Sequence, residues 1–286
     1  MNRVAIMGET PAQLVWGRFR HHTLAVVGAL VLVALVGAAL LAPVFEMAMG
    51  LDANTVDLFN RFRAPSSSHP LGTDELGRDL FLRLLYGGRV SLLVGLVAAL
   101  FATVIGTVVG LTAGYFGGRM DAFLMRVTDG VISLPLLPLL IVLAAIDLSK
   151  LGLPGASTES ESVSLYRIIA IVALVGWTTV ARLVRASTLS IKQRTFVMAA
   201  VAQGGGPLRI MSVHILPNLA SPIIVATTLA AGNIILLESV LSFLGLGIQP
   251  PLPSWGNLLT NAQEMIWEAP LQAFYPGVLI FATVIA

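Results

Sequence analysis

Few side chains in this sequence have the types and spacing that chemistry on a bound molecule requires. The four histidines have no second metal ligand at a useful spacing: His21, His22, His69 and His214. Cysteine is absent, which excludes a disulfide framework, a thiolate metal site and a cysteine nucleophile. The patterns GxxxxGKS, GxxxxGKT, HExxH and GxSxG are also missing. The sequence therefore predicts no catalytic site, no metal site and no nucleotide-binding P-loop.

Ionisable groups inside apolar runs are the next candidates, because they are costly in lipid and usually functional. Glu238 is the deepest of them, and Asp129 lies near the start of another run. A transporter driven by protons or sodium is expected to bury several acids or a relay, which this chain does not offer. For Glu238, a structural role near the mouth of a path and a direct contact in a substrate path both stay open. The energy for any transport would then have to enter from a partner.

Composition places the chain in a membrane. Of its 286 residues, 56% are apolar and 11% are charged, whereas soluble domains carry about 25% charged residues. The mean hydropathy is +0.88, and the net charge of +2 gives a nucleic-acid role little support. Apolar runs of the length that spans a bilayer predict an all-α polytopic membrane protein with about six transmembrane helices, at 24–42, 90–111, 131–146, 168–180, 222–237 and 275–286.

The order of these runs gives a predicted organisation. It consists of a cytoplasmic N-terminal segment (1–23), a first transmembrane helix (24–42), an extracytoplasmic segment (43–89) and a core transmembrane region (90–286). A cleaved signal peptide is the alternative for the first run, which is longer than the usual 7–15 apolar residues. The run at 275–286 covers only about 18 Å of a roughly 30 Å hydrocarbon core, so we expect the last helix to be truncated.

Local patterns add three expectations about these spans. Gly106 and Gly110 form a GTVVG face, for which helix packing is the favoured interpretation. Pro135 and Pro138 are expected to kink or unwind the third span. The Gly- and Pro-rich stretch 244–255 cannot continue a regular helix, and its Trp255 suits the membrane interface, as does Trp267.

The loop predicted at 182–220 is the most unusual segment. Between residues 182 and 217 it carries five basic residues and no acid, which places it in the cytoplasm, together with the N-terminus, by the positive-inside rule. Small residues at Ala199, Ala200 and Ala202 allow close approach of a partner, and Gly204–Gly206 with Pro207 force a turn. A second short helix is expected at 208–216, with Pro217 ending it or starting the next span. Helical loops of this length are uncommon as plain connections.

This loop closely resembles that of the inner-membrane permease subunits of bacterial ATP-binding-cassette importers. Their hallmark reads EAA, three residues, G, nine residues, I, one residue, LP. The matching positions are Ala199, Ala200, Gly204, Leu216 and Pro217. Two positions depart from the pattern, since Met198 stands for the Glu and His214 for the Ile. The departure at Met198 favours docking by shape over docking through a glutamate ion pair.

Other stretches resemble more narrowly the second permease of dipeptide, oligopeptide and nickel importers. They are HPLGTDELGRDLFLRLLYGGRVSLLVG (69–95), AGYFGGRMDAFLMRVTD (113–129), VHILPNLASPIIV (213–225) and ESVLSFLGLGIQPPLPSWGNLL (238–259). The resemblance covers the chain from about residue 16 onward. It implies the fold of type I importer permeases, with a cytoplasmic coupling helix, in the bacterial inner membrane.

The resemblance also implies a complex. This chain would form half of a peptide path with a second, homologous permease, above two ATPase subunits that bind ATP and Mg, and below an extracytoplasmic substrate-binding protein. The chain itself would bind no cofactor and catalyse no reaction. The residues implied in coupling to the ATPases are Ala199, Ala200, Gly204, Gly205, Leu208 and Pro217. The alternatives are an ion-coupled secondary transporter, a membrane-embedded enzyme, and an importer permease for nickel chelates or glutathione.

Overall fold

Long apolar helices dominate the computed structural model, which describes residues 11–146, 161–260 and 265–286. Four helical runs are long and apolar enough to cross a membrane: α2 (Thr23–Leu40), α4 (Leu80–Phe116), α7 (Glu161–Lys192) and the run Pro207–Phe243, which contains α10 (Ala220–Phe243). The pair α5 (Gly118–Ser133) and α6 (Leu136–Ala145) forms a fifth candidate, and α12 (Pro270–Ile285) is a shorter apolar helix. The predicted all-α polytopic fold is confirmed, and six spans result if the bent pair and α12 each count as one.

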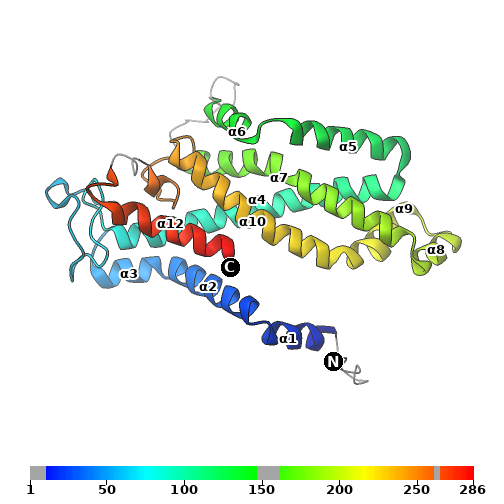
Figure 1. The fold of residues 1–286 in the computed structure, drawn as a ribbon, viewed down its shortest axis with the longest axis horizontal. Helices are drawn as coiled ribbons and strands as arrows, with labels where there is room; N and C mark the ends of the chain where they lie inside the picture. Colours follow the sequence, from blue (N-terminus) through cyan, green and yellow to red (C-terminus); the bar gives the residue numbers. More distant parts are fainter. Residues whose placement is uncertain (1–10, 147–160, 261–264) are drawn as a thin grey trace.

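Figure 1 shows these helices lying side by side as a bundle with two different ends. One end carries α8 (Thr195–Ala202) and α9 (Pro207–Arg209), and we call it the α8 end. The opposite end, which we call the loop end, carries α3 (Ala42–Met49) and the irregular residues 50–79. The helix α1 (Pro11–His21) precedes α2 and lies apart from the core of the bundle (Figure 1).

Several helices are longer than the apolar runs that predicted them. The helix α4 begins ten residues before 90, because the Asp79 carboxylate caps its N-terminus by accepting a hydrogen bond from the Leu82 amide at 2.8 Å. Arg83 in its first turn is buried, and the guanidinium Nε lies 3.4 Å from the Asp74 carboxylate. The helix α7 extends from Glu161 to Lys192. Residues 182–192 of the predicted loop therefore belong to a helix, as do residues 80–89 of the predicted extracytoplasmic segment.

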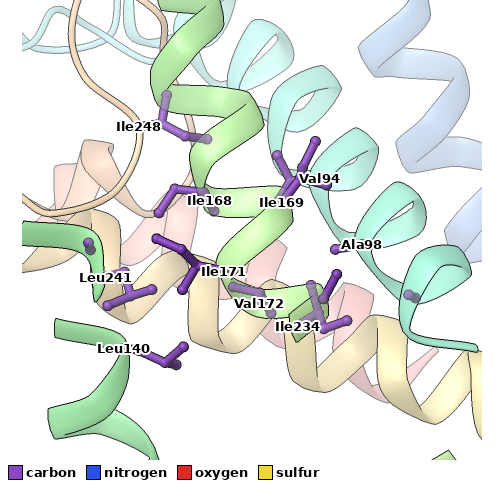
Figure 2. Packing of buried hydrophobic residues seen from close by; sticks show 13 residues of the cluster. Val94, Ala98, Leu140, Ile168, Ile169, Ile171, Val172, Ile234, Leu241 and Ile248 are labelled. Carbon is purple, nitrogen blue, oxygen red and sulfur yellow. The ribbon is translucent and has the colours of Figure 1, made fainter. Parts of the chain in front are cut away.

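Glycines let α4 and α7 approach closely. A Cβ added at Gly106 would lie 2.6 Å from the Trp177 carbonyl oxygen, and one at Gly110 would lie 2.4 Å from the Ala181 carbonyl oxygen. The packing interpretation of the GTVVG face is thus confirmed. Nearer the loop end, α4, α6, α7 and α10 enclose an apolar core in which Val94, Val172 and Ile234 converge (Figure 2).

The third predicted span is broken. The helix α5 ends at Ser133, Pro135 precedes α6, and the axes of the two helices meet at 84°. The prolyl ring at Pro135 removes a backbone donor and disfavours a helical conformation at the preceding residue. The expected kink or unwinding of the third span is therefore confirmed. Residues 147–160, between the predicted third and fourth spans, lie outside the described residues.

Two elements of the loop end complete the fold. The segment 244–256 is irregular, as predicted, with a left-handed backbone at Gly245 (φ +75°). Short 3-10 turns occur at Leu58–Asn60 (η1) and Asn257–Leu259 (η5). Trp255 is only 1% exposed, and its indole Nε1 donates to the Leu84 carbonyl oxygen at 3.0 Å. The expectation that Trp255 lies at the membrane interface is therefore wrong, because this ring packs inside the protein.

Candidate functional site

The first candidate site is the segment around α8, residues 194–210, which we call the α8 segment. Its helix ends in a Schellman motif, in which the Gly204 amide donates to the Val201 carbonyl at 2.9 Å and the Gly205 amide to the Ala200 carbonyl at 3.0 Å. Gly204 adopts φ +81°, and a Cβ at Gly205 would lie 2.8 Å from the Ala200 oxygen. The predicted turn is thus confirmed, and each of these two glycines has its own steric reason.

The α8 segment is attached to the bundle by a few buried side chains. Val197 is 1% exposed, and it belongs to one apolar cluster with Ile191 of α7 and with Ile210 and Ile215, which follow the turn. The π-helical turn Ile210–Ile215 (η3) and the 3-10 turn Leu216–Leu219 (η4) lead from there into α10. The α8 segment therefore projects beyond the bundle while its two ends remain fixed (Figure 1).

The outward surface of this segment carries a cluster of large apolar side chains. Four large side chains are exposed there without a covering element: Phe196, Met198, Val201 and Leu208, with Leu208 at 79%. Ala199 is exposed as well, and Ala200 is partly buried. Single exposed apolar residues need no explanation, but a cluster of them on one projecting segment is typical of a docking surface. Sequence reasoning missed Phe196 and Val201, because the eight residues of α8 are apolar on nearly every face and Val197 alone turns inward.

Pro217 occupies a different element from the rest of the predicted set. The helix continues through it, from π-helical turns to 3-10 turns, without the break expected at this proline. Pro217 has no amide to donate. Beside it, the Asn218 side chain donates to the His214 carbonyl at 2.7 Å. The separate short helix expected at 208–216 is therefore wrong, because local adjustments of the helical ladder accommodate the ring.

Three of the five basic residues assigned to the loop are engaged by the bundle. The Arg185 guanidinium donates twice to the Asp121 carboxylate, at 2.5 and 2.6 Å, and Arg182 lies 2.5 Å from Asp129. The Lys192 ammonium donates to the Tyr115 carbonyl. Arg194 and Arg209 are exposed, and the described part of the chain provides no ion pair for either. These two charges are therefore available to a partner of the α8 segment.

The second candidate site surrounds Glu238 near the loop end. Glu238 is fully buried, and its two carboxylate oxygens accept from the Ser242 hydroxyl at 2.7 Å and the Ser91 hydroxyl at 3.1 Å. Ser91 in turn accepts from the Trp255 amide at 3.1 Å. We call these four residues the Glu238 cluster. The cluster joins α10, α4 and the segment after α10. Its members come from distant parts of the sequence, where their residue types were the only signal of the cluster.

Close packing surrounds this carboxylate. A Cβ at Gly247 would lie 2.0 Å from the Ser242 hydroxyl, and one at Gly256 would lie 2.6 Å from the Ser239 Cα. The carboxylate is therefore sealed by the chain itself and satisfied by hydroxyl donors, which makes its burial tolerable. The arrangement favours the structural interpretation, and a direct contact of Glu238 with substrate stays a prediction.

The described residues hold no group of three or more metal-ligating side chains. Of the four histidines, His69 has a carboxylate partner, since its Nδ1 lies 2.9 Å from the Asp79 carboxylate. That carboxylate also caps α4 through its other oxygen. His69 thus belongs to a structural hydrogen-bond network at the loop end.

A third feature was not predicted from the sequence. A cavity of about 560 Å³ lies between the α5–α6 break, α7 and α10. Its lining is mostly apolar, and its polar side chains come from α7 and α10: Thr178, Thr179 and Asn233. The ion pair between Arg182 and Asp129 lies beyond the cavity toward the α8 end. Arg182 directly precedes the lining residue Leu183, and Asp129 lies two positions before the lining residue Val131.

Comparison with known families covers most of this architecture. Residues 106–286 match the family described as binding-protein-dependent transport system inner membrane component. Residues 10–64 match a second family, the N-terminal TM domain of oligopeptide transport permease C. The first match includes the α8 segment, the lining of the cavity and every member of the Glu238 cluster except Ser91.

Curated relatives align over nearly the whole chain. The dipeptide transport system permease protein DppC of Alkalihalophilus pseudofirmus is 36% identical over 96% of this chain and 85% of its own length. The oligopeptide transport system permease protein OppC of Bacillus subtilis is 34% identical, over 93% and 82%. The glutathione transport system permease protein GsiD of Escherichia coli is 37% identical, over 97% and 86%.

Proposed function

Because this chain belongs to the family of binding-protein-dependent transport system inner membrane components, we propose that it forms half of the path by which an ATP-driven importer carries peptides across a bacterial inner membrane. The substrate class follows from the relatives, which are named for dipeptides, oligopeptides and glutathione. Peptide bonds are the chemistry that these three names share. The alternative nickel-chelate substrate has no counterpart among them.

The observation that carries the coupling role is the exposed apolar surface of the α8 segment. Two alanines and four large apolar side chains project beyond the bundle, with the exposed charges of Arg194 and Arg209 beside them. Ala199, Ala200, Gly204, Gly205 and Leu208 would make or shape this contact with an ATPase subunit. Pro217 would act indirectly, by shaping the run that connects the segment to α10. The concentration of basic residues supports a cytoplasmic α8 end and N-terminus.

The proposed mechanism follows from this anchoring. ATP binding would close the two ATPase subunits, and the fixed ends of the α8 segment would transmit their displacement to α7 and α10. Such coupling requires that the α8 segment bind the two ATPase states with different affinity, because equal affinity shifts no equilibrium. The chain needs no catalytic group or cofactor for this role, since ATP and Mg would be bound by the ATPase subunits. Substrate would arrive from an extracytoplasmic binding protein and pass between this chain and a second permease.

Reconstitution tests the proposal directly. The chain, a second permease and the ATPase subunits are placed in proteoliposomes with the binding protein, and uptake of radiolabelled dialanine is measured. We expect uptake that requires ATP and Mg and persists when proton and sodium gradients are collapsed. Uptake that follows an ion gradient without ATP would instead establish the ion-coupled alternative. ATP-dependent uptake of a nickel chelate with no uptake of dialanine would overturn the peptide assignment alone.

A further inference from the structure

Asn233 is exposed near the middle of α10, within a run that is otherwise apolar. Its side chain makes no hydrogen bond to any residue that the structure describes. The neighbours Ile234 and Ile235 face inward and are buried, whereas Asn233 faces away from that core. A primary amide exposed to hydrocarbon without a partner costs several kcal/mol in transfer experiments (about 4–8). The position of this side chain therefore implies a polar environment that the single chain does not supply.

The cavity described above lies directly beside this amide. Asn233 lines it together with Thr178 and Thr179 of α7, and the rest of the lining is mostly apolar. The Thr178 hydroxyl is satisfied within its own helix, by the Val175 carbonyl at 3.2 Å. Asn233 is thus the lining side chain with the largest unused hydrogen-bonding capacity among the described residues.

A broken span borders the same cavity. The non-helical residues between α5 and α6 contribute Leu134 to the lining, next to Ile132 and Leu136. Irregular backbone at membrane depth is tolerated where it is buried in protein or lines a water-filled space. Discontinuous helices at such a depth are a general feature of substrate sites in transporters. The unpartnered amide and the broken span are independent observations that point to the same cavity.

We propose that Asn233 is a hydrogen-bonding contact for the peptide groups of the substrate as it passes through this cavity. The inference rests on the proposed function, in which peptides are transported. A side-chain amide presents both a donor and an acceptor, which match the C=O and N–H of a peptide group. The apolar remainder of the lining accommodates side chains with little selection among them. Recognition of the backbone alone would let one path serve peptides of different sequence.

Water access is tested first, and the absence of native cysteine makes the test clean. In the assembled complex, Asn233→Cys is exposed to a charged, membrane-impermeant methanethiosulfonate, and the label is read on this chain by mass. The matched control is Thr228→Cys, an exposed polar position on the same helix that does not line the cavity. We expect labelling at Asn233→Cys at least roughly tenfold faster than at the control, slowed by dialanine with its binding protein. Labelling only in the isolated chain would show that position 233 is covered by the second permease, which overturns the proposal.

The peptide contact itself is tested by transport. Asn233→Leu should raise the dialanine concentration for half-maximal uptake about fivefold, as expected for one lost hydrogen bond, while Asn233→Gln should restore most of the affinity. Alanyl-sarcosine, whose peptide nitrogen carries no hydrogen, should be affected less by Asn233→Leu than dialanine is. Equal effects on the two substrates, or none, would overturn the role of Asn233 while wild-type ATP-dependent uptake leaves the proposed function intact. If the wild-type complex imports no peptide, the proposed function fails whatever the labelling result.

Discussion

The α8 segment and the Glu238 cluster lie at opposite ends of the same bundle and are held in different ways. Near the loop end, a sealed carboxylate joins three segments through hydroxyl and amide hydrogen bonds. At the α8 end, a short helix is fixed by Val197 and by a backbone turn, and its large apolar side chains remain exposed. The Glu238 carboxylate therefore has its hydrogen bonds supplied internally, whereas the α8 segment leaves apolar surface and charge for a partner. Substitutions at the two ends should fail in different ways, by loss of stability near Glu238 and by loss of coupling at α8.

The largest expected effect is on stability, at Glu238. Replacement by leucine removes both acceptor oxygens, so the hydroxyl hydrogens of Ser91 and Ser242 lose the acceptors that they have in this closed site. Each stranded buried group costs about 1–3 kcal/mol, so Glu238→Leu should lower the thermal denaturation midpoint of the detergent-solubilised chain by several degrees and reduce its yield. An unchanged midpoint would contradict the structural role.

Glu238→Gln sharpens this prediction. The amide has the same shape as the carboxylate, and the two hydroxyls can reorient toward it, so most of the stability should remain. Dialanine uptake by the reconstituted complex should then be close to that of the wild type. Clearly altered uptake with unchanged stability would favour the substrate-path interpretation of Glu238.

The second effect is on coupling, at Gly204. Leucine disfavours the left-handed backbone found there, φ +81°, by about 1–2 kcal/mol. Gly204→Leu should disrupt the Schellman turn, abolish peptide-stimulated ATP hydrolysis and uptake, and leave membrane insertion intact. Gly204→Asn should retain part of the activity, because asparagine tolerates this conformation better.

The control for this test lies two residues further on. Gly206 has an ordinary backbone (φ −69°) and nothing within 4 Å of an added Cβ. Gly206→Leu should therefore preserve most of the coupled activity. If Gly204→Leu supports coupled uptake as well as Gly206→Leu does, the assignment of coupling to this turn is wrong.

A smaller effect is expected at Leu208. Its side chain is 79% exposed, so Leu208→Ala should leave the stability of the chain unchanged. If it docks on an ATPase subunit, its truncation should weaken the affinity of the ATPase subunits for the reconstituted permease pair roughly tenfold. Met47, which is 84% exposed on α3 at the loop end, provides the matched control. Equal affinities for Leu208→Ala and Met47→Ala would remove Leu208 from the proposed contact.

The smallest effect is expected at Arg194. Exposed charges at the rim of an interface change association rates and salt dependence more than affinity. Arg194→Gln should therefore weaken ATPase binding less than about threefold and flatten its dependence on ionic strength. A loss of binding greater than that caused by Leu208→Ala would show that the contact is mainly electrostatic.

Local signals in the sequence explain why some features were predictable. Proline at 135 and glycine at 204 restrict the backbone wherever they occur, so the broken span and the turn after α8 were expected and are present. The N-terminal start of α4 was missed because Arg78, Arg83 and Arg89 look like the boundary of a span. Asp74 and Asp79, close in sequence, neutralise or cap this region and extend the helix.

Features that depend on distant residues could not be read in this way. Trp255 has the composition of an interface anchor, and only its contact with Leu84 and Ser91 shows that it is buried. Asn233 is one polar residue in an apolar run, and it attracted no attention in the sequence. Its significance depends on the relative placement of α7, α10 and the α5–α6 break.

The sequence alone determined the membrane class, the helical architecture and the family resemblance, because hydropathy, backbone restriction and motif spacing are local properties. The tertiary structure decided which side chains of the α8 segment face outward, that Glu238 is enclosed by hydroxyl donors, and that Asn233 faces a cavity. Exposure and hydrogen-bond partners depend on contacts between helices far apart in the chain. Such contacts leave no periodic or compositional signal in any single segment.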